Sequence, residues 1–375
     1  MQLFSQGRRI TVIAMESESV VMNLAHLGAP KILIAVVLGV MWSKNLPDIH
    51  PRFHFFDLFC GEAQASRAAK ARGYSVASFD KLRALGQRTM DFCTPPGLLL
   101  TIHTILCLHV QSICLLGPCC ASWGVPARGT SKRSYINPYG AQELGFVSDA
   151  NQTVALATLL CMLLLARNCF YILEQPSNTL LHRHPRWDYF CNHVSFVFRC
   201  AFWMLLHGSL SSKRTVCFSN GEWIQHLDLG TLSAAQRISQ TKIEPTRKYV
   251  RKGQQKFQGT SQLKSTGAYP PGFAHKILDS YESRGTVGCA LRFKRKIDVS
   301  KTDRQIFEEL DLGDLWLESK LHLAWFYIHG NKYLAIPESW RDTMESFHRE
   351  LCARVRIDES DRQALNQLIA ECNEL

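Results

Sequence analysis

Apolar and polar positions along the chain fall into short blocks that predict strands and helices in turn. Phe53 to Phe59 (FHFFDLF) is an aromatic run typical of a buried strand, and it is followed by Cys60-Gly61. The alanine-rich segment EAQASRAAKARG predicts a helix closed by Gly73. Tyr74 to Phe79 has the pattern of a second strand, and Asp80 follows it. These blocks predict a strand–turn–helix–strand unit with an acid at the tip of its second strand, an arrangement that can hold a nucleotide-type cofactor.

The same alternation continues through the middle of the chain. Four blocks predict a helix, a strand, a long apolar helix and a strand, in that order: Leu98 to Val110, Ile113 to Leu116, Ala150 to Arg167, and Cys169 to Leu173. Two later blocks have the pattern of further strands, Arg199 to Leu210 and Thr215 to Phe218. Strands that alternate with helices are typical of a parallel sheet covered on both faces. The predicted fold class is therefore α/β, with a Rossmann-like sheet and helices on both faces.

Composition divides the chain into three parts. Residues 1–50 are the least regular, and their uninterrupted apolar run from Ile32 to Trp42 predicts a helix packed on the domain or a loosely attached extension. That run is too short to span a bilayer, so we expect no membrane contact, with an N-terminal anchor as the alternative. Residues 51–285 hold the α/β unit. Residues 286–375 have Glu/Leu-rich helical periodicity, which predicts an acidic helical region and leaves a protein partner open.

Charge is unevenly distributed along the 375 residues, whose formal net charge is +11. The stretch 241–301 has 14 Lys/Arg against 4 Asp/Glu, whereas 302–375 has 8 against 15. Within the basic stretch, Thr241 to Gly267 is polar and Gly/Gln-rich with Tyr249 and Phe257 interleaved, which predicts a loop-rich segment able to follow a phosphate backbone. The expected partner is therefore nucleic acid, with DNA favoured and RNA as the alternative.

The 14 cysteines follow no disulfide framework and include no CxxC pair. Their number and scatter favour reduced thiols in an intracellular protein, and their spacing is not that of a zinc finger, so we expect no metal site. The basic cluster Arg292 to Lys296 (RFKRK) favours the nucleus over the cytoplasm.

Candidate chemistry gathers where two predicted strands end. Gly117-Pro118 breaks one strand and is followed by Cys119 and Cys120, and Glu174 follows another. Because ligands bind at the carboxyl ends of the strands in open α/β sheets, a thiol there is a candidate nucleophile, although small cysteines also fill cores. Lys213-Arg214 precedes a further strand and could orient Glu174, clamp a phosphate or simply be solvated.

The order of these motifs resembles the cytosine carbon-5 methyltransferases. The resemblance covers roughly Phe53 to Leu278 and rests on FFDLFCGEAQAS, Asp80, Asp91, GPCCASWG and LEQP. It implies a Rossmann-like sheet that binds S-adenosylmethionine and methyl transfer to carbon 5 of cytosine in DNA. Two variant motifs, EQP at residues 174–176 and KRT at residues 213–215, are similar to those of a phage or mobile-element branch of the family.

The resemblance also implies roles for single residues. Cys120 matches the nucleophile, Glu174 the acid that steadies the ring nitrogen, and Arg214 the arginine that supports this acid. The resemblance implies that Phe59 lies against the adenine, Gly61 beside the methionine portion, Asp80 at the ribose and Asp91 at the adenine amino group. The full set of implied cofactor residues is Asp57, Phe59, Gly61, Asp80, Asp91 and Pro118.

Several positions depart from the family pattern. Ala63 and Gln64 replace a glycine pair, Cys119 replaces a proline, and Gln175-Pro176 replaces Asn-Val. The closing signature has only an echo in GAYPP, Gly267 to Pro271. Two alternatives follow from these departures, an inactive relative that binds nucleic acid and a methyltransferase that acts on RNA or another substrate.

Overall fold

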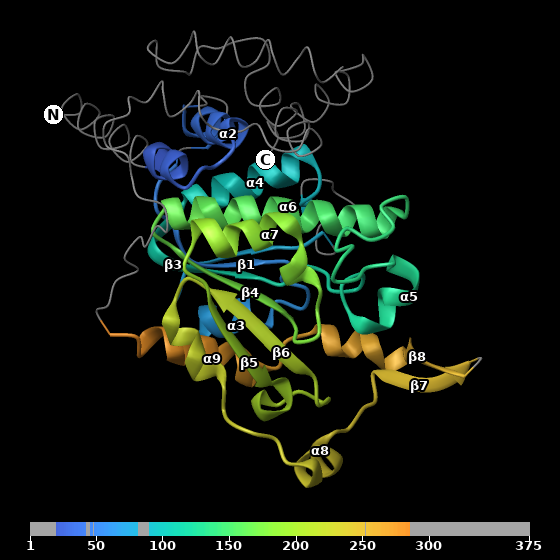
Figure 1. Cartoon of the computed structure of the whole chain (residues 1–375). Coiled ribbons are helices and arrows are strands. Elements are labelled where there is room, and N and C mark those ends of the chain that lie inside the picture. Colours follow the sequence, from blue (N-terminus) through green and yellow to red (C-terminus); the bar gives the residue numbers. More distant parts are fainter. Residues whose placement is uncertain (1–19, 43–45, 48, 82–89, 252, 286–375) are drawn as a thin grey trace, which may run out of the picture.

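The computed structural model describes residues 20–42, 46–47, 49–81, 90–251 and 253–285 (Figure 1). The predicted C-terminal helical region and the basic cluster Arg292 to Lys296 lie outside these residues. The expectations for a protein partner through the C-terminal helices and for nuclear import therefore stay predictions.

A six-stranded sheet forms the centre of the molecule (Figure 1). Its strand order is β2-β1-β3-β4-β6-β5, and β6 runs antiparallel to both of its neighbours while the other pairs are parallel. The predicted α/β class with a mostly parallel sheet is confirmed, and the arrangement is compatible with a Rossmann-like fold. The six strands are β1 (Phe53–Leu58), β2 (Val76–Phe79), β3 (Leu108–Leu116), β4 (Phe170–Pro176), β5 (Phe198–Trp203) and β6 (Arg214–Ser219).

Helices cover both faces of the sheet, as the alternation of elements predicts (Figure 1). One face carries α4 (Pro95–Leu106), α6 (Gly145–Ala166) and α7 (Pro185–Tyr189). The other face carries α3 (Gln64–Ala71) and α9 (Pro271–Glu282). Of these helices, α3 packs against both strands that it joins, β1 and β2, and α6 packs against β4, so each buries apolar side chains on the sheet.

Side-chain alternation along the strands separates two cores. Phe56 and Leu58 of β1 belong to the core under α4 and α6, whereas Phe55 belongs to the core under α3 and α9. Because strand side chains alternate between faces, Asp57 of β1 shares the face of Phe55. By the same rule Glu174 of β4 shares the face of Ile172, which also packs in the second core. The two acids therefore lie on one face of the sheet.

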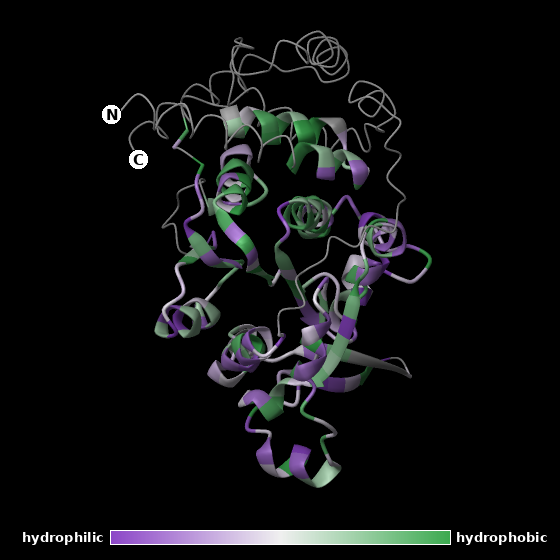
Figure 2. Ribbon diagram, turned by 90° about the vertical axis from the view of Figure 1, so that its left-hand side faces the viewer, coloured by the Kyte–Doolittle hydropathy of each residue, from purple (hydrophilic) through white to green (hydrophobic). Residues whose placement is uncertain are grey.

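The apolar run in the N-terminal part forms α2 (Lys31–Trp42), which packs against α4. Most of its apolar side chains are fully buried, and a short helix over residues 20–26 precedes it, from which the Asn23 side chain donates to the Ala166 carbonyl at 3.1 Å. Among the described residues one helix, α6, is long and apolar enough to cross a membrane, but 83% of its most apolar window is buried inside the molecule. Figure 2 shows the apolar character of these helices.

Several boundaries differ from the sequence-based expectation. The predicted helix Leu98 to Val110 begins earlier, at Pro95, because the Thr94 hydroxyl caps it by accepting from the Gly97 amide at 3.3 Å. It also ends earlier, since β3 already begins at Leu108. The predicted strand from Arg199 to Leu210 is likewise shorter, because a helical turn, Met204–His207, follows β5.

The segment Thr241 to Gly267 is more regular than the predicted loop-rich stretch. It contains a hairpin of β7 (Thr246–Arg251) and β8 (Gln254–Gly259), which pair antiparallel. The short helix α8 (Ala234–Gln240) precedes the hairpin, and all of its residues are exposed. The hairpin lies against the helical turn η2 (Val125–Ala127), and α5 (Arg128–Ser131) follows that turn.

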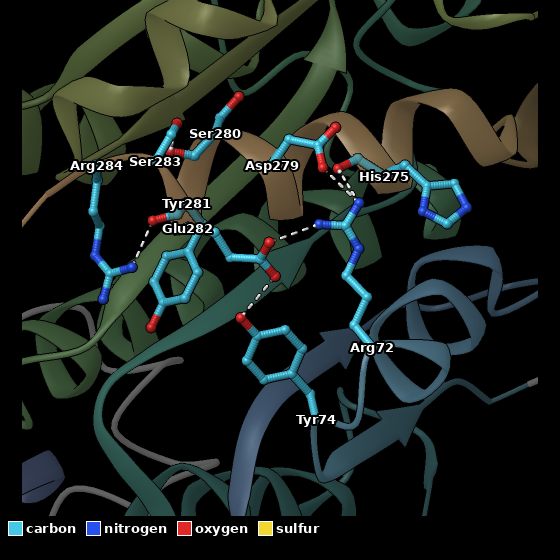
Figure 3. A network of polar contacts seen from close by, with 9 residues as sticks. All are labelled: Arg72, Tyr74, His275, Asp279, Ser280, Tyr281, Glu282, Ser283 and Arg284. Atoms are coloured by element: carbon cyan, nitrogen blue, oxygen red, sulfur yellow. Dashed lines mark hydrogen bonds and ion pairs between the residues drawn. The ribbon is translucent and has the colours of Figure 1, made fainter.

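A polar network joins α9 to the end of α3 (Figure 3). The Arg72 guanidinium contacts Asp279 at 2.6 Å and Glu282 at 2.9 Å, and the Tyr74 hydroxyl donates to Glu282 at 3.0 Å. Burial and the Glu282 carboxylate raise the pKa of Tyr74 to about 12. The network fixes α9 on the sheet face, and the residues just before α9 are thereby held near the ends of the strands.

Candidate active site

The strand order reverses next to β1, since β2 lies on one side of it and β3 on the other. In open α/β sheets such a switch point is where ligands bind, outside the carboxyl ends of the strands. The residues that leave β1 there are Phe59 to Gly61, and those that leave β3 are Gly117 and Pro118. The predicted cofactor residues and the predicted nucleophile loop therefore meet at one edge of the sheet.

The turn after β1 is built from left-handed backbone. Phe59, Gly61 and Ala63 have φ values of 66°, 47° and 52°. The Gly61 amide donates to the Asp80 carboxylate at 2.9 Å, which joins the tips of β1 and β2. A Cβ atom at Gly61 would meet nothing within 4 Å, so the turn faces open space. Ala63 thus holds a conformation that glycine adopts more easily.

The other predicted cofactor residues have different surroundings. The Phe59 ring meets Phe92 edge to face at 5.1 Å, next to Asp91, whose side chain accepts from the Cys93 amide at 3.1 Å. Pro118 is buried. Asp57 is also buried, and its Oδ2 accepts from the amide and hydroxyl of Ser66, at 3.1 and 2.7 Å. Asp57 therefore orders the first turn of α3 and stands behind the turn that carries Gly61.

The two thiols of the GPCC loop differ in exposure. Cys119 is exposed, whereas Cys120 is half-buried. Burial raises the pKa of Cys120, the ammonium group of Lys213 lowers it, and the carboxylate of Glu174 raises it further. The loop continues through Trp123, whose amide donates to the Cys120 carbonyl at 3.0 Å. Cys120 is thus a partly shielded thiol that two opposite charges influence.

Glu174 is buried, with 5% of its surface exposed, and it lies within β4 opposite Cys217 of β6. A carboxylate at such depth needs partners, and Glu174 has two. Its Oε1 accepts from the Lys213 Nζ at 3.3 Å, and its Oε2 accepts from the Tyr269 hydroxyl at 3.2 Å. The acid is therefore held from both oxygens.

The cation that contacts Glu174 is Lys213, and the expectation that Arg214 takes this place is wrong. Arg214 is exposed, and its guanidinium lies over the Trp203 ring at 5.4 Å. Lys213 immediately precedes β6, so its neighbour Arg214 takes the opposite direction. Burial is the largest single influence on Lys213 and lowers its pKa, but the charge of Glu174, the Cys120 thiol and the hydrogen bond to Glu174 together outweigh burial and raise the pKa above its ordinary value, so Lys213 stays an ammonium ion.

Tyr269 reaches the site from the segment Gly267 to Pro271, at the start of α9. A Cβ atom on Gly117 would lie 2.3 Å from the Tyr269 hydroxyl oxygen, so only glycine fits at position 117. Burial and the nearby charges of Glu174 and Asp57 raise the pKa of Tyr269 well above its ordinary value. Tyr269 is therefore a neutral donor that connects the GPCC loop to Glu174.

Gln175 connects β4 to the same loop. This side chain is fully buried, and its Nε2 donates to the Pro118 carbonyl at 2.7 Å. Its Oε1 accepts from the Thr179 hydroxyl at 3.3 Å. The glutamine that departs from the family's Asn-Val thus fixes the backbone one residue before the thiol pair.

Arg133 supports the loop from the other side. It is 2% exposed, and its guanidinium stacks on the Trp123 ring at 3.4 Å. It also donates to the Ser122 hydroxyl at 3.1 Å and to Asn151 of α6 at 2.8 Å. Burial lowers the pKa of Arg133 to about 10. This buried cation ties the residues after Cys120 to α6.

The site thus brings together Cys120, Glu174 and Lys213, with Phe59, Gly61 and Asp80 around the neighbouring turn. Sequence reasoning did not assign Tyr269, Gln175 or Arg133 to it. The GAYPP motif at Gly267 to Pro271 was a sequence signal for Tyr269. No sequence motif marks Gln175 or Arg133 as site residues, because their contacts depend on how the loop folds. Comparison with protein-family models, with characterised proteins and with solved structures finds no match to this chain.

Proposed function

We propose that this protein is an S-adenosylmethionine-dependent methyltransferase that acts on carbon 5 of cytosine in DNA, with Cys120 as the nucleophile. The observation that carries the proposal is the convergence of Cys120, Glu174 and Lys213 at the carboxyl edge of the sheet. A thiol, an acid and a cation are the groups that this reaction needs together. Their placement beside the switch point of the sheet supports a cofactor site next to them.

The residues around the β1 turn fit such a cofactor. The turn faces open space at Gly61, and the Asp80 carboxylate and the Phe59 ring flank it. A carboxylate at the tip of the second strand suits ribose hydroxyls, and an aromatic ring suits adenine. Phe59, Gly61, Asp80, Asp91 and Pro118 would hold the group, with Asp57 ordering the turn from behind. When bound, S-adenosylmethionine would supply the methyl group.

The chain's own residues account for the activation of the base. Carbon 5 of cytosine is a poor nucleophile until the Cys120 sulfur forms a bond to carbon 6, which moves the ring electrons toward carbon 5. Glu174 would face the charge that develops at the ring nitrogen and relay a proton to it from the Lys213 ammonium group, which donates to its Oε1, while Tyr269 donates to its Oε2. Once carbon 5 carries the methyl group, its proton would leave to solvent and the electrons of that bond would form the carbon 5–carbon 6 double bond. The carbon–sulfur bond then breaks, its electron pair returns to the Cys120 thiolate, and the ring nitrogen gives its proton back through Glu174.

Thiol activation is the demanding step in this site. The raised pKa of Cys120 means that its thiol is protonated at neutral pH in the free protein. Lys213 opposes this effect, because a nearby ammonium ion favours the thiolate. We infer that Lys213 serves both groups, as the counterion of Glu174 and as the cation that lowers the cost of ionising Cys120.

Trapping on 5-fluorocytosine DNA tests the proposal, because fluorine at carbon 5 blocks the release of the enzyme. The full-length protein is incubated with S-adenosylmethionine and a duplex with scattered 5-fluorocytosines, and adducts are separated by denaturing electrophoresis. We expect an adduct with the wild-type protein and with Cys119→Ser, and none with Cys120→Ser. Peptide mapping should place the modified residue at Cys120.

Other outcomes contradict the proposal in distinct ways. An adduct that survives Cys120→Ser but disappears in Cys119→Ser would assign the nucleophile to the neighbouring thiol. Binding of the duplex without any adduct and without cofactor binding by calorimetry would favour an inactive nucleic-acid-binding relative. An adduct that forms on 5-fluorocytosine RNA but not on DNA would show that the substrate is RNA and not DNA.

A further inference from the structure

Two arginines lie over one tryptophan at the edge of the sheet. The guanidinium carbon of Arg214 is 5.4 Å from the centroid of the Trp203 ring, and that of Arg237 is 4.6 Å from it. Arg214 begins β6, Trp203 ends β5, and Arg237 comes from the exposed helix α8. Stacking on an aromatic face is a usual way to orient a guanidinium. We call these three residues the Trp203 cluster.

The charges of this cluster are not neutralised within the described part of the chain. Neither arginine of the cluster takes part in the salt bridges of Arg72 with α9 or of Lys213 with Glu174. Because both guanidiniums lie over the same ring, they are at most about 10 Å apart, roughly the Debye length at 0.1 M ionic strength. Two exposed cations at that separation repel each other. Stacking orients them, and an anion bound by both would relieve their repulsion.

The cluster lies beside the candidate active site. Trp203 and Arg214 are paired in register, and β6 is antiparallel to β4, so the first residue of β6 is at the carboxyl edge of the parallel strands. Lys213, the residue before Arg214, contacts the buried Glu174. Lys213 thus contacts a buried acid, whereas its neighbour Arg214 is exposed at the surface. An anion held by Arg214 would lie at this carboxyl edge of the sheet, one residue along the chain from the cation that contacts Glu174.

The chemistry of the cluster fits a phosphodiester. A guanidinium donates two parallel hydrogen bonds to phosphate oxygens, and two oriented guanidiniums can share the charge of neighbouring phosphates. On the other side of the site, the hairpin against η2 exposes Arg247, Lys248 and Arg251, so cations flank the nucleophile loop from two directions. We infer that Arg214 and Arg237, oriented by Trp203, bind the backbone phosphates of the DNA strand that carries the target cytosine. This inference rests on the proposed function.

The test measures DNA binding apart from chemistry. Full-length protein with Cys120→Ser is titrated against a fluorescein-labelled 12-bp duplex over a range of NaCl concentrations, and binding is followed by anisotropy. The slope of log K against log salt should become less negative by about 0.9 for each phosphate that the protein no longer neutralises. We expect this change in Arg214→Gln and in Arg237→Gln, and about twice as much in the double variant.

Two further variants separate charge from packing. Arg214→Lys and Arg237→Lys keep the charge, so they should retain the wild-type slope although the stack on Trp203 is weakened. Arg199→Gln removes an exposed cation from the opposite end of β5 and should leave the slope unchanged. The single glutamine variants still give a result if the double variant fails to fold.

An unchanged slope in both single glutamine variants would overturn the inference. So would an equal change in Arg199→Gln, because the cluster would then contribute only net charge. Failure of the proposed function gives a different result. In that case the wild-type protein forms no adduct with 5-fluorocytosine DNA, while the slope still depends on Arg214 and Arg237. An adduct together with an unchanged slope would contradict the phosphate site at Arg214 and Arg237 and leave the proposed function intact.

Discussion

The hydroxyl of Tyr269 lies so close to Gly117 that a Cβ atom at position 117 would be 2.3 Å from its oxygen. The same hydroxyl donates to Glu174 at 3.2 Å. The absence of a side chain at Gly117 is therefore a condition for the contact between Tyr269 and the acid. This relationship connects the start of the GPCC loop, the end of β4 and the segment before α9 in one small volume.

Gly117→Ala should displace Tyr269 and cost about 1–3 kcal/mol of stability, as overpacking does in well-filled sites. Tyr269→Phe removes the clashing oxygen, and the next ring atom would lie 3.4 Å from the new Cβ, which is tolerable. We therefore expect the double variant to be more stable than Gly117→Ala alone. Urea unfolding of the four proteins measures this coupling.

Gly129→Ala is the matched control for this cycle, since a Cβ atom there meets nothing within 4 Å. Because Gly129 lies in α5, alanine there should stabilise by up to about 1 kcal/mol, and by the same amount in the wild-type and Tyr269→Phe backgrounds. Strictly additive effects of Gly117→Ala and Tyr269→Phe would show that the hydroxyl does not fill the space above Gly117.

Adduct formation by Cys120 should accelerate as the pH rises, because burial raises the pKa of its thiol above the ordinary value near 8.5. The thiolate is the reactive form, so its fraction increases through the raised pKa. Lys213 lowers the pKa of Cys120, so Lys213→Gln should move the profile to higher pH. Rates of trapping on 5-fluorocytosine DNA between pH 6 and 10, about the range in which thiols titrate, measure both profiles.

Lys70→Gln serves as the control, because it removes an exposed lysine of α3 and should leave the profile in place. A profile that Lys213→Gln does not move would show that this ammonium ion does not act on the thiol.

Ala63→Gly should stabilise the protein by up to about 1 kcal/mol. Ala63 is buried with φ 52°, and a left-handed conformation costs a residue with a Cβ atom about 1–2 kcal/mol, part of which glycine loses again as chain entropy. Ala71→Gly, in regular helix at the end of α3, should destabilise instead. Thermal unfolding of both variants decides the question, and a destabilised Ala63→Gly would contradict it.

Tyr74 should make stability depend on pH in the alkaline range. Its pKa is raised to about 12 in the folded protein, against about 10 in an unfolded chain, so its contribution is present below pH 10 and is lost as the pH rises toward 12. The stability difference between wild type and Tyr74→Phe should therefore shrink or reverse over that interval. A difference that stays constant from about pH 9 to 12 would contradict the raised pKa.

The sheet could be predicted from the sequence because its strands are short apolar blocks between helical ones. The placement of Cys120 and Glu174 at one edge followed from the same pattern, since parallel strands end together. The contact between Glu174 and Lys213 could not be predicted, because it depends on the register of β6, and a shift of one residue exchanges Lys213 with Arg214. Likewise, Arg133 reaches Trp123 only through the folding of the loop after α5, which has no periodic pattern.

Gln175 offers the sharpest test of how the nucleophile loop is held. Its Nε2 donates to the Pro118 carbonyl at 2.7 Å in a buried setting, so Gln175→Met leaves that carbonyl without its donor and should cost about 1–3 kcal/mol. A loosened loop should also expose the half-buried Cys120. In a Cys119→Ser background, modification of Cys120 by a thiol reagent, located by peptide mapping, should therefore become faster in Gln175→Met. Thr179→Val removes only the longer 3.3 Å contact to Gln175 and should have a smaller effect on both quantities. Equal effects of the two substitutions, or an unchanged rate of modification, would mean that Gln175 packs in the core without positioning the thiol.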